Sequence, residues 1–345
     1  QNTLENGFWI DVRHGRYNKI IIDGFTIKNY NGTAILLFNT GSWTEYLTVE
    51  NCVIKNCVSG IVLDNVAENV IIRNNTISNI SPGIAIHAAT DHFKHSIVSK
   101  NRISDVPSDY GINFGGPYAI VENNELTNVR KGISTGGNFR STIRGNTLYN
   151  ITERSIRIGT GGAKEILAYK NEIIDSGRPF IFYPGTVSTA IENYIENSGG
   201  IDGEGPDYLR FENNTIKNAD LYIYEASESG PENRPEKFIF KGNIKIGKDH
   251  PLLISGVIDG EISNNIFIGK GIQFQYGEEM ISDNISIVNN VFYNSGFGIY
   301  VGESPVQNLY IKNNIFSDIT GYCVCLLYTS PSPRDLSTSR MPSSA

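Results

Sequence analysis

Apolar and polar residues alternate in short segments along almost the whole chain. Around the asparagine at position 75, "VIIR" (70–73) precedes the corner, "TI" (76–77) follows it, and "GIAIH" (83–87) comes after a turn. This period of two residues is typical of β-strands with one buried face, and helical spacing is absent. Each such unit therefore predicts three short strands.

The unit repeats, and its most regular position is an asparagine. Twelve steps from Phe25 to Asn314 give a mean period of about 24 residues, and Phe25 and Cys52 stand in place of the asparagine in the first two copies. A short period with small corner residues predicts a parallel β-solenoid, whose coils stack at ~4.8 Å. Asparagine tolerates the left-handed conformation of a sharp corner, and stacked amides can hydrogen-bond along the column. The column comprises Asn75, Asn101, Asn124, Asn146, Asn171, Asn193, Asn214, Asn243, Asn265, Asn290 and Asn314.

The repeated motif is an Asn-x-aliphatic corner followed by Gly-aliphatic-x-aliphatic, as in Asn75–Ile77 with Gly83–Ile86. In this motif the chain resembles the right-handed parallel β-helix superfamily, the pectate-lyase-like group, and its carbohydrate-active members. The resemblance implies an all-β, single-stranded right-handed parallel β-helix of about 13 coils over residues 1–322. The last ~20 residues, from about Cys325, resemble a translated sequencing adapter, and we expect a disordered, non-native tail at 323–345.

Composition narrows the classes of partner. With 345 residues, 39% of them hydrophobic, the chain can bury a core, while its net charge is −7. Nucleic acids and anionic membranes are therefore not expected as partners, and no apolar run is long enough to span a bilayer. Cys52 and Cys57 lack a metal-ligand spacing, and we interpret them as small buried apolar side chains.

The resemblance also implies a location and a state of assembly. We expect a secreted protein, extracellular or periplasmic, that acts as a monomer on a polysaccharide or oligosaccharide. The chain begins with Gln1, which indicates a fragment or a processed product.

In the resembling family, the strand that follows the second turn lines a groove that binds polysaccharide. Alternation along the "GI" strands predicts which side chains face outward there. The predicted outward pairs are Val62 and Asp64, Ala85 and His87, Asn113 and Gly115, Ser134 and Gly136, Arg157 and Gly159, Ile181 and Tyr183, Asp202 and Glu204, Tyr222 and Tyr224, Leu253 and Ser255, Gln273 and Gln275, and Tyr300 and Gly302.

Asp202 and Glu204 are the strongest catalytic candidates in this row. Two residues apart on one strand, their Cβ atoms should lie ~6.5 to 7 Å apart. Carboxyl separations of about 6.5–9.5 Å suit an inverting glycosidase, in which a water lies between acid and base. The alternative is a solvated acidic turn, and we interpret the nearby Asp207 as a turn residue.

Other candidates surround this acid pair. Arg157 could bind a uronate carboxylate or neutralise an enolate, although an ion pair with a neighbouring coil is the alternative. His87 is a candidate base. Sugar binding is assigned to Asn113, Tyr183, Tyr222 and Tyr224, the tyrosines by stacking on sugar rings.

These residues leave three functions open. Hydrolysis needs two carboxylates and no ion, so no cofactor is required. Elimination by a lyase needs a base and often Ca²⁺, which the acidic run 202–207 could hold. A non-catalytic, glycan-binding or structural β-helix, such as an adhesin or spike module, is the third. The chemically mixed row favours an enzyme, either a glycoside hydrolase or a polysaccharide lyase.

Overall fold

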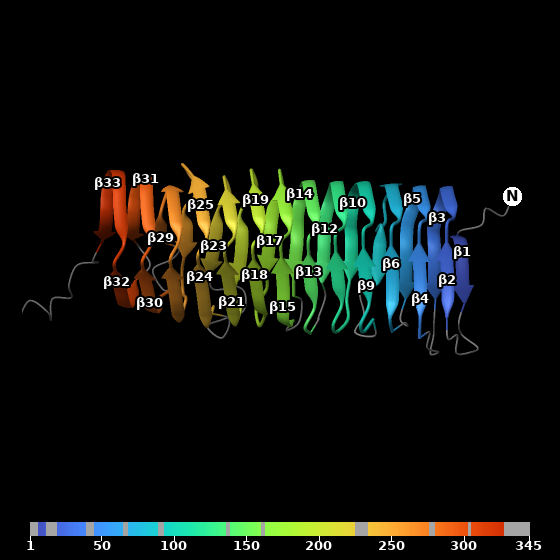
Figure 1. The fold of residues 1–345 in the computed structure, drawn as a ribbon, viewed down its shortest axis with the longest axis horizontal. Coiled ribbons are helices and arrows are strands. Elements are labelled where there is room, and N and C mark those ends of the chain that lie inside the picture. The colour runs from blue at the N-terminus through green and yellow to red at the C-terminus, as the bar shows by residue number, and fades with distance from the viewer. Residues whose placement is uncertain are drawn as a thin grey trace, which may run out of the picture.

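The computed structural model describes residues 6–11, 19–38, 45–64, 68–88, 93–135, 139–159, 163–224, 234–275, 280–302 and 305–327. Within these ranges every element is a β-strand. The strands wind into a rod, with β1 (Asn6–Asp11) near one end and β33 (Ile315–Leu326) at the other (Figure 1). Of the expected tail at 323–345, residues 323–326 belong to strand β33, and the residues from 328 onward lie outside the described ranges.

One strand from each coil enters a 13-stranded parallel sheet, which we call the first sheet. Its first and last members lie at the ends of the rod, so that about 11 turns are stacked on both sides. The expected number of 13 coils is thus slightly too high as a count of complete turns, while the solenoid class is confirmed. The strands are β2 (Ile20–Asp23), β4 (Leu47–Glu50), β6 (Val70–Arg73), β9 (Ile97–Ser99), β11 (Ile120–Glu122), β13 (Thr142–Arg144), β15 (Lys164–Tyr169), β18 (Val187–Ile191), β21 (Tyr208–Glu212), β24 (Lys237–Lys241), β27 (Asp259–Ser263), β30 (Ser282–Val288) and β32 (Val306–Lys312).

The remaining strands form a 20-stranded parallel sheet that bends between a second and a third face. In some coils one strand covers both faces: β3 (Thr26–Phe38), β5 (Val53–Asp64), β10 (Arg102–Phe114), β12 (Glu125–Thr135), β14 (Thr147–Ile158), β31 (Val291–Val301) and β33. In others a turn separates a second-face strand from a third-face strand: β7 (Thr76–Ile80) and β8 (Ile86–Ala88), β16 (Glu172–Ile174) and β17 (Arg178–Phe182), β19 (Tyr194–Glu196) and β20 (Ile201–Glu204), β22 (Thr215–Lys217) and β23 (Leu221–Tyr224), β25 (Ile244–Gly247) and β26 (Leu252–Ile254), β28 (Ile266–Gly269) and β29 (Ile272–Phe274).

The corner between the first sheet and the second face holds the predicted asparagine column. Asn193 shows the pattern: its Nδ2 donates to Asn214 Oδ1 at 2.9 Å and to the Ala168 carbonyl at 3.0 Å. Its own Oδ1 accepts the backbone N–H and the amide of Asn171 at 2.9 and 3.0 Å. The column is buried, so these contacts satisfy polar groups that water cannot reach.

The sequence predicts a left-handed conformation for the column asparagine at this corner. In the structure, the residue before the asparagine adopts it instead. Asn74, Lys100 and Glu192 have φ of 55°, 54° and 52°, whereas Asn75 and Asn193 are not in the left-handed region. The backbone therefore turns one residue early. The asparagine that follows can then point its amide inward.

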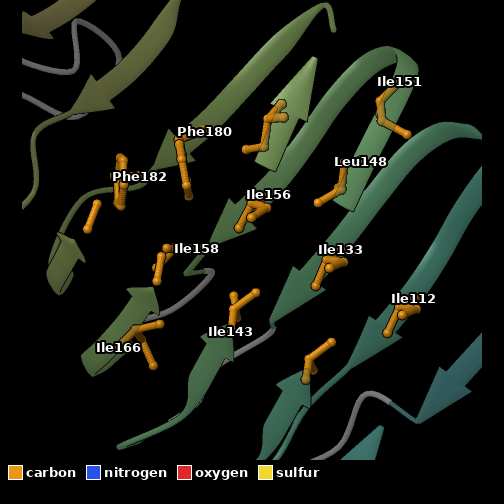
Figure 2. Packing of buried hydrophobic residues seen from close by; sticks show 14 of the residues in the cluster. Ile112, Ile133, Ile143, Leu148, Ile151, Ile156, Ile158, Ile166, Phe180 and Phe182 are labelled. Carbon is orange, nitrogen blue, oxygen red and sulfur yellow. The ribbon is translucent and has the colours of Figure 1, made fainter. Parts of the chain in front are cut away.

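The core runs along the inside of the rod as columns of apolar side chains. Ile112, Ile133 and Ile156 pair in register on successive coils and point to the same interior (Figure 2). Cys52 and Cys57 belong to this core, as expected, and are free thiols. Each coil buries its apolar side chains against the neighbouring coils, as in other repeat proteins, so the stability of the rod comes from contacts between adjacent coils.

We expect Asn193→Ala to lower the free energy of unfolding by about 3 kcal/mol, because it removes the partners of two buried backbone groups and weakens the column on both sides. The backbone groups are the Ala168 carbonyl and the N–H of Asn171. The side-chain amides of Asn171 and Asn214 each lose one of their hydrogen bonds. Urea unfolding would measure the loss. The matched control is Asn197→Gly in the same coil, since Asn197 is exposed, has φ of 48°, and glycine keeps that conformation. Equal losses in both variants would contradict a structural role for the column.

Candidate active site

Outward side chains of the third face form columns, because neighbouring parallel strands pair residue by residue. The column that contains most of the expected residues, here called the site column, is Val62, His87, Asn113, Ser134, Arg157, Ile181, Asp202, Tyr222, Leu253, Gln273 and Tyr300. Beyond it, Glu204 pairs with Tyr224, and Tyr183 follows Phe182, which pairs with Gly203. The fold thus gathers the predicted residues on one face, spread over many coils.

One coil departs from the predicted alternation. Val62 pairs with His87 and not with Ala85, which is fully buried instead of outward. The turn between β7 and β8 takes up residues 81–85, so the third-face strand of this coil begins later than the "GI" motif suggests. His87 still faces outward, but it occupies the position predicted for Ala85.

Asp202 is the most unusual carboxyl group of the third face. It is only 8% exposed, and its Oδ2 lies 3.2 Å from Nη1 of Arg178 on the preceding coil. Burial raises the pKa of Asp202 to about 6, with a smaller raising effect from Glu204, although Arg178 acts in the opposite direction. A carboxyl group that keeps its proton into mildly acidic solution is suited to donate it in catalysis.

Glu204 follows Asp202 on the same strand and is partly exposed. Its Oε1 accepts a hydrogen bond from the Tyr224 hydroxyl at 3.3 Å. Burial first, and the charge of Glu204 second, raise the pKa of Tyr224, so this tyrosine remains a donor. Two residues along a strand separate the Cβ atoms of the acids by ~6.5 to 7 Å, which leaves space for a water molecule between the carboxyl groups.

A second column, beside the acid pair, carries cations that the sequence analysis did not single out. Tyr110, Lys131, Arg154 and Arg178 pair in register on four successive coils. The available signal was a cation three residues before each site-column residue, in "RKGI" (130–133), "RSIR" (154–157) and "GRPF" (177–180). Each cation has a carboxylate partner: Lys131 with Asp109 at 3.5 Å, Arg154 with Glu153 at 3.0 Å and Arg178 with Asp202 at 3.2 Å.

Arg157 differs from these cations because none of the described carboxylates pairs with it. Its Nη1 donates to the Tyr110 hydroxyl at 3.2 Å, and its guanidinium lies 4.9 Å from the centroid of the Tyr183 ring. The Nε atoms of Arg157 and Arg154 are buried and find no acceptor within the described part of the chain. An unpaired buried donor costs about 1–3 kcal/mol, so these two guanidinium groups are held at a cost in stability.

His87 and Asn113 lie far from the acid pair. His87 Nδ1 is 3.3 Å from Asn113 Nδ2, and burial lowers the pKa of His87 against the raising effects of Asp64 and Asp109. Five strand steps separate His87 from Asp202, or ~24 Å, whereas Arg157 is two steps from Asp202, or ~10 Å. The structure therefore brings Arg157 to the acid pair and leaves His87 and Asn113 outside that site.

Tyr222 pairs with Asp202 in the site column, but its hydroxyl points elsewhere. It donates to Asp220 Oδ2 at 2.8 Å, and Asp220 Oδ1 lies 3.1 Å from His250 Nδ1. Sequence analysis missed Asp220 and His250, because they lie in turns of adjacent coils and outside the predicted outward pairs. A shallow depression lined by Tyr222, Tyr224 and residues of the next coils continues from here along the third face.

The acidic run 202–207 is the place where a lyase would hold Ca²⁺. Over the described ranges, no group of three or more His, Cys, Asp and Glu side chains could hold a metal ion. Asp207 lies in the bend before β21, which is a turn position as predicted, and its carbonyl accepts the backbone N–H of Lys237. As for membranes, the part of the chain that is described contains no helix that could cross one.

Comparison with known proteins identifies the repeat. The sequence model described as "Right handed beta helix region" matches residues 2–96, 34–193 and 162–334, which together span most of the chain. The sequence matches no curated protein.

Several solved structures are similar to this chain at low identity. The catalytic unit of a GH87 alpha-1,3-glucanase from Streptomyces thermodiastaticus has 13% identity and a TM-score of 0.46, covering 94% of this chain and 65% of that chain. A PL6 alginate lyase in complex with a trisaccharide has 10% identity and a TM-score of 0.45, covering 94% and 83%. An exopolygalacturonase from Thermotoga maritima has 11% identity and a TM-score of 0.40, covering 90% and 84%. This chain thus spans slightly less than two thirds of the glucanase.

We expect Asp202→Asn to stabilise the protein at pH 7. The folded pKa of Asp202 is raised from 3.8 to about 6, so the folded state binds more protons in that window and loses stability as pH rises through it. Removing the buried charge should raise the free energy of unfolding at pH 7 by up to about 3 kcal/mol. It should also flatten the pH dependence between 3.8 and about 6.

Urea unfolding over this pH range would measure both effects. Glu204→Gln is the matched control, because Glu204 is partly exposed and the substitution removes the same charge two residues away. A lower stability of Asp202→Asn at pH 7 would contradict the account of Asp202 as a strained buried acid.

Proposed function

The chain belongs to the right-handed β-helix family, and from this premise we propose that it is an enzyme that hydrolyses a polysaccharide bound along the third face. The observation that carries the proposal is the acid pair: one carboxyl group buried with a pKa of about 6, and a second, more exposed one two residues further along. Unequal environments for two neighbouring carboxyl groups are what acid and base roles require.

In this proposal Asp202 is the general acid. It donates its proton to the glycosidic oxygen as the bond from that oxygen to the anomeric carbon breaks. Glu204 accepts a proton from the water that attacks the anomeric carbon from the opposite face, and the configuration is inverted. The Tyr224 hydroxyl, which donates to Glu204, would hold this carboxylate in place.

The substrate proposed is an acidic glycan. The protein has a net charge of −7, yet Lys131, Arg154, Arg157 and Arg178 gather beside the acid pair. Arg157 retains donors without a described carboxylate partner, and a uronate carboxylate fits a guanidinium bidentately. The Tyr183 ring lies against this guanidinium and could support a sugar ring at the same time, while the Tyr110 hydroxyl holds the guanidinium in place. We propose that such a polymer is met outside the cell by a secreted enzyme.

Elimination is the second candidate, and Arg157 is the observation that favours it. A guanidinium two coils from the acid pair could neutralise a uronate carboxylate while a base removes the neighbouring proton. Elimination also needs a proton donor for the leaving oxygen, which Asp202 could be. Hydrolysis accounts better for the acid pair, because it uses both carboxyl groups, one as the acid and the other as the base that activates water. The two reactions differ in their products, since only elimination leaves an unsaturated sugar.

The acid pair is tested by Asp202→Asn and Glu204→Gln. Each substitution keeps the shape and removes a proton-transfer group, so each should lower kcat on the best substrate by about 10²-fold or more. Reducing-end release would measure the rates, with circular dichroism to show that the fold is kept. The control is Glu172→Gln, which removes an exposed carboxylate from the second face. Near-wild-type rates in both acid variants would contradict the proposed site.

Arg157→Ala tests the substrate class separately. We expect it to weaken kcat/KM on uronate-containing chains by about 10- to 100-fold, while hydrolysis of a carboxyl-reduced version of the same polymer changes little. Arg102→Ala is the matched control, because Arg102 lies on the second face of the same fold, where it pairs with Glu125. Equal losses on the charged and the reduced polymer would show that Arg157 does not recognise the carboxylate.

A further inference from the structure

A polar cluster lies at the turn between the second and third faces, next to the acid pair but outside it. Asp220, in the turn before β23, accepts hydrogen bonds on both carboxylate oxygens, from the Tyr222 hydroxyl at 2.8 Å and from His250 Nδ1 at 3.1 Å. We call Asp220 and His250 the corner dyad. Because both of its oxygens are engaged, Asp220 fixes the position of the tyrosine relative to the turn.

The turn itself is tied down by a buried lysine. Lys245 is fully buried, and its Nζ donates to the carbonyls of Ala219 at 2.9 Å and of His250 at 2.6 Å. One side chain thus links the backbone beside Asp220 to the backbone of His250. Gly247 leaves room for the His250 ring, since a Cβ there would lie 3.1 Å from ring atoms. The two members of the corner dyad are therefore held side by side by the backbone as well as by their own contact.

The ring of Tyr222 packs over Gly200 and beside Asp202. A Cβ added at Gly200 would lie only 2.4 Å from Tyr222 Cε2 and 3.5 Å from Asp202 Oδ1. The edge of the Tyr222 ring and the Asp202 carboxyl group therefore share the space above Gly200. Any residue with a side chain at position 200 would fill that space. Asp202 pairs with Tyr222 in the sheet, so the ring covers the side of Asp202 that faces the next coil.

We propose that Asp220 and His250 are positioning residues, which hold the Tyr222 hydroxyl at the turn so that its ring shields the Asp202 carboxyl group from water. The inference rests on the proposed role of Asp202 as proton donor. A donor needs a dry environment to keep its proton, and an unanchored ring would leave that environment open to solvent. The corner dyad would thus act on catalysis only through Tyr222.

Charged and titratable neighbours of Asp202 lie on β17, on its own strand and on β23. Arg178 on β17 lowers the pKa of Asp202, and Glu204 on its own strand raises it. Tyr224 on β23 is a protonated neighbour whose hydroxyl contacts Glu204. Gly200→Ala alters none of these groups and no charge, so a changed titration of Asp202 in that variant would report on the tyrosine ring.

The test is a titration of Asp202 by carbon-13 NMR of protein labelled at the aspartate carboxyl carbons, with the signal assigned by its loss in Asp202→Asn. Tyr222→Ala removes the ring, and Gly200→Ala displaces it while all hydrogen-bonding groups remain. We expect both to lower the midpoint from about 6 by about one pH unit. Asp220→Asn and His250→Gln should lower it in the same direction, and Arg178→Gln should raise it.

The control is Tyr194→Phe, which removes another tyrosine hydroxyl bonded to a carboxylate two residues away, Glu196, on the second face. It should leave the midpoint unchanged. An unchanged midpoint in folded Tyr222→Ala and Gly200→Ala would overturn the shielding, and a shift in these two but in neither Asp220→Asn nor His250→Gln would overturn the role of the corner dyad. The titration needs no substrate, so its result is independent of whether the proposed hydrolysis is found.

Discussion

The buried amide of the corner asparagine is the interaction on which the stacking of the coils depends. Each amide joins the backbone of the preceding coil to the next asparagine, so the contact repeats at one fixed place per turn. Because the corner is fixed, the strands on either side of it keep their register, and outward residues line up in columns. Asp202 lies beside Tyr222, and Arg157 lies two steps away, as a consequence of this register.

The candidate site is built from groups that cost stability. Asp202 is a buried acid, Arg157 keeps a buried donor without an acceptor among the described residues, and Lys245 is a fully buried amine whose pKa burial lowers to about 7. Elsewhere the described core is mainly apolar, and the asparagine column satisfies its own buried amides. Conflicts between local chemistry and burial that gather on neighbouring coils are expected at functional sites. A long repeat tolerates them, because each coil is supported by both neighbours.

The sequence predicts the fold well because the repeat is visible as a period of about 24 residues. The site depends on turn lengths and side-chain contacts between coils, which the period does not specify. Alternation placed Asp202, Glu204 and Tyr222 on one face. It misplaced His87, since the length of the turn before β8 is not encoded in hydrophobic alternation. It also assigned the left-handed position to Asn75 and not to Asn74, because either asparagine satisfies the local rule. The contacts of Arg178 and His250 join side chains of different coils, and such contacts depend on turn lengths and rotamers.

The central claim is that the third face hydrolyses an acidic polysaccharide. The most direct measurement is a screen of the intact chain against neutral and uronate-containing polysaccharides, with and without a chelator, reading reducing ends and the ultraviolet absorbance of unsaturated sugars together. The account predicts new reducing ends from a uronate-containing polymer, without ultraviolet absorbance and without loss of rate in the chelator. Products that absorb in the ultraviolet would contradict hydrolysis, and the absence of cleavage on every polymer would contradict the enzymatic function itself.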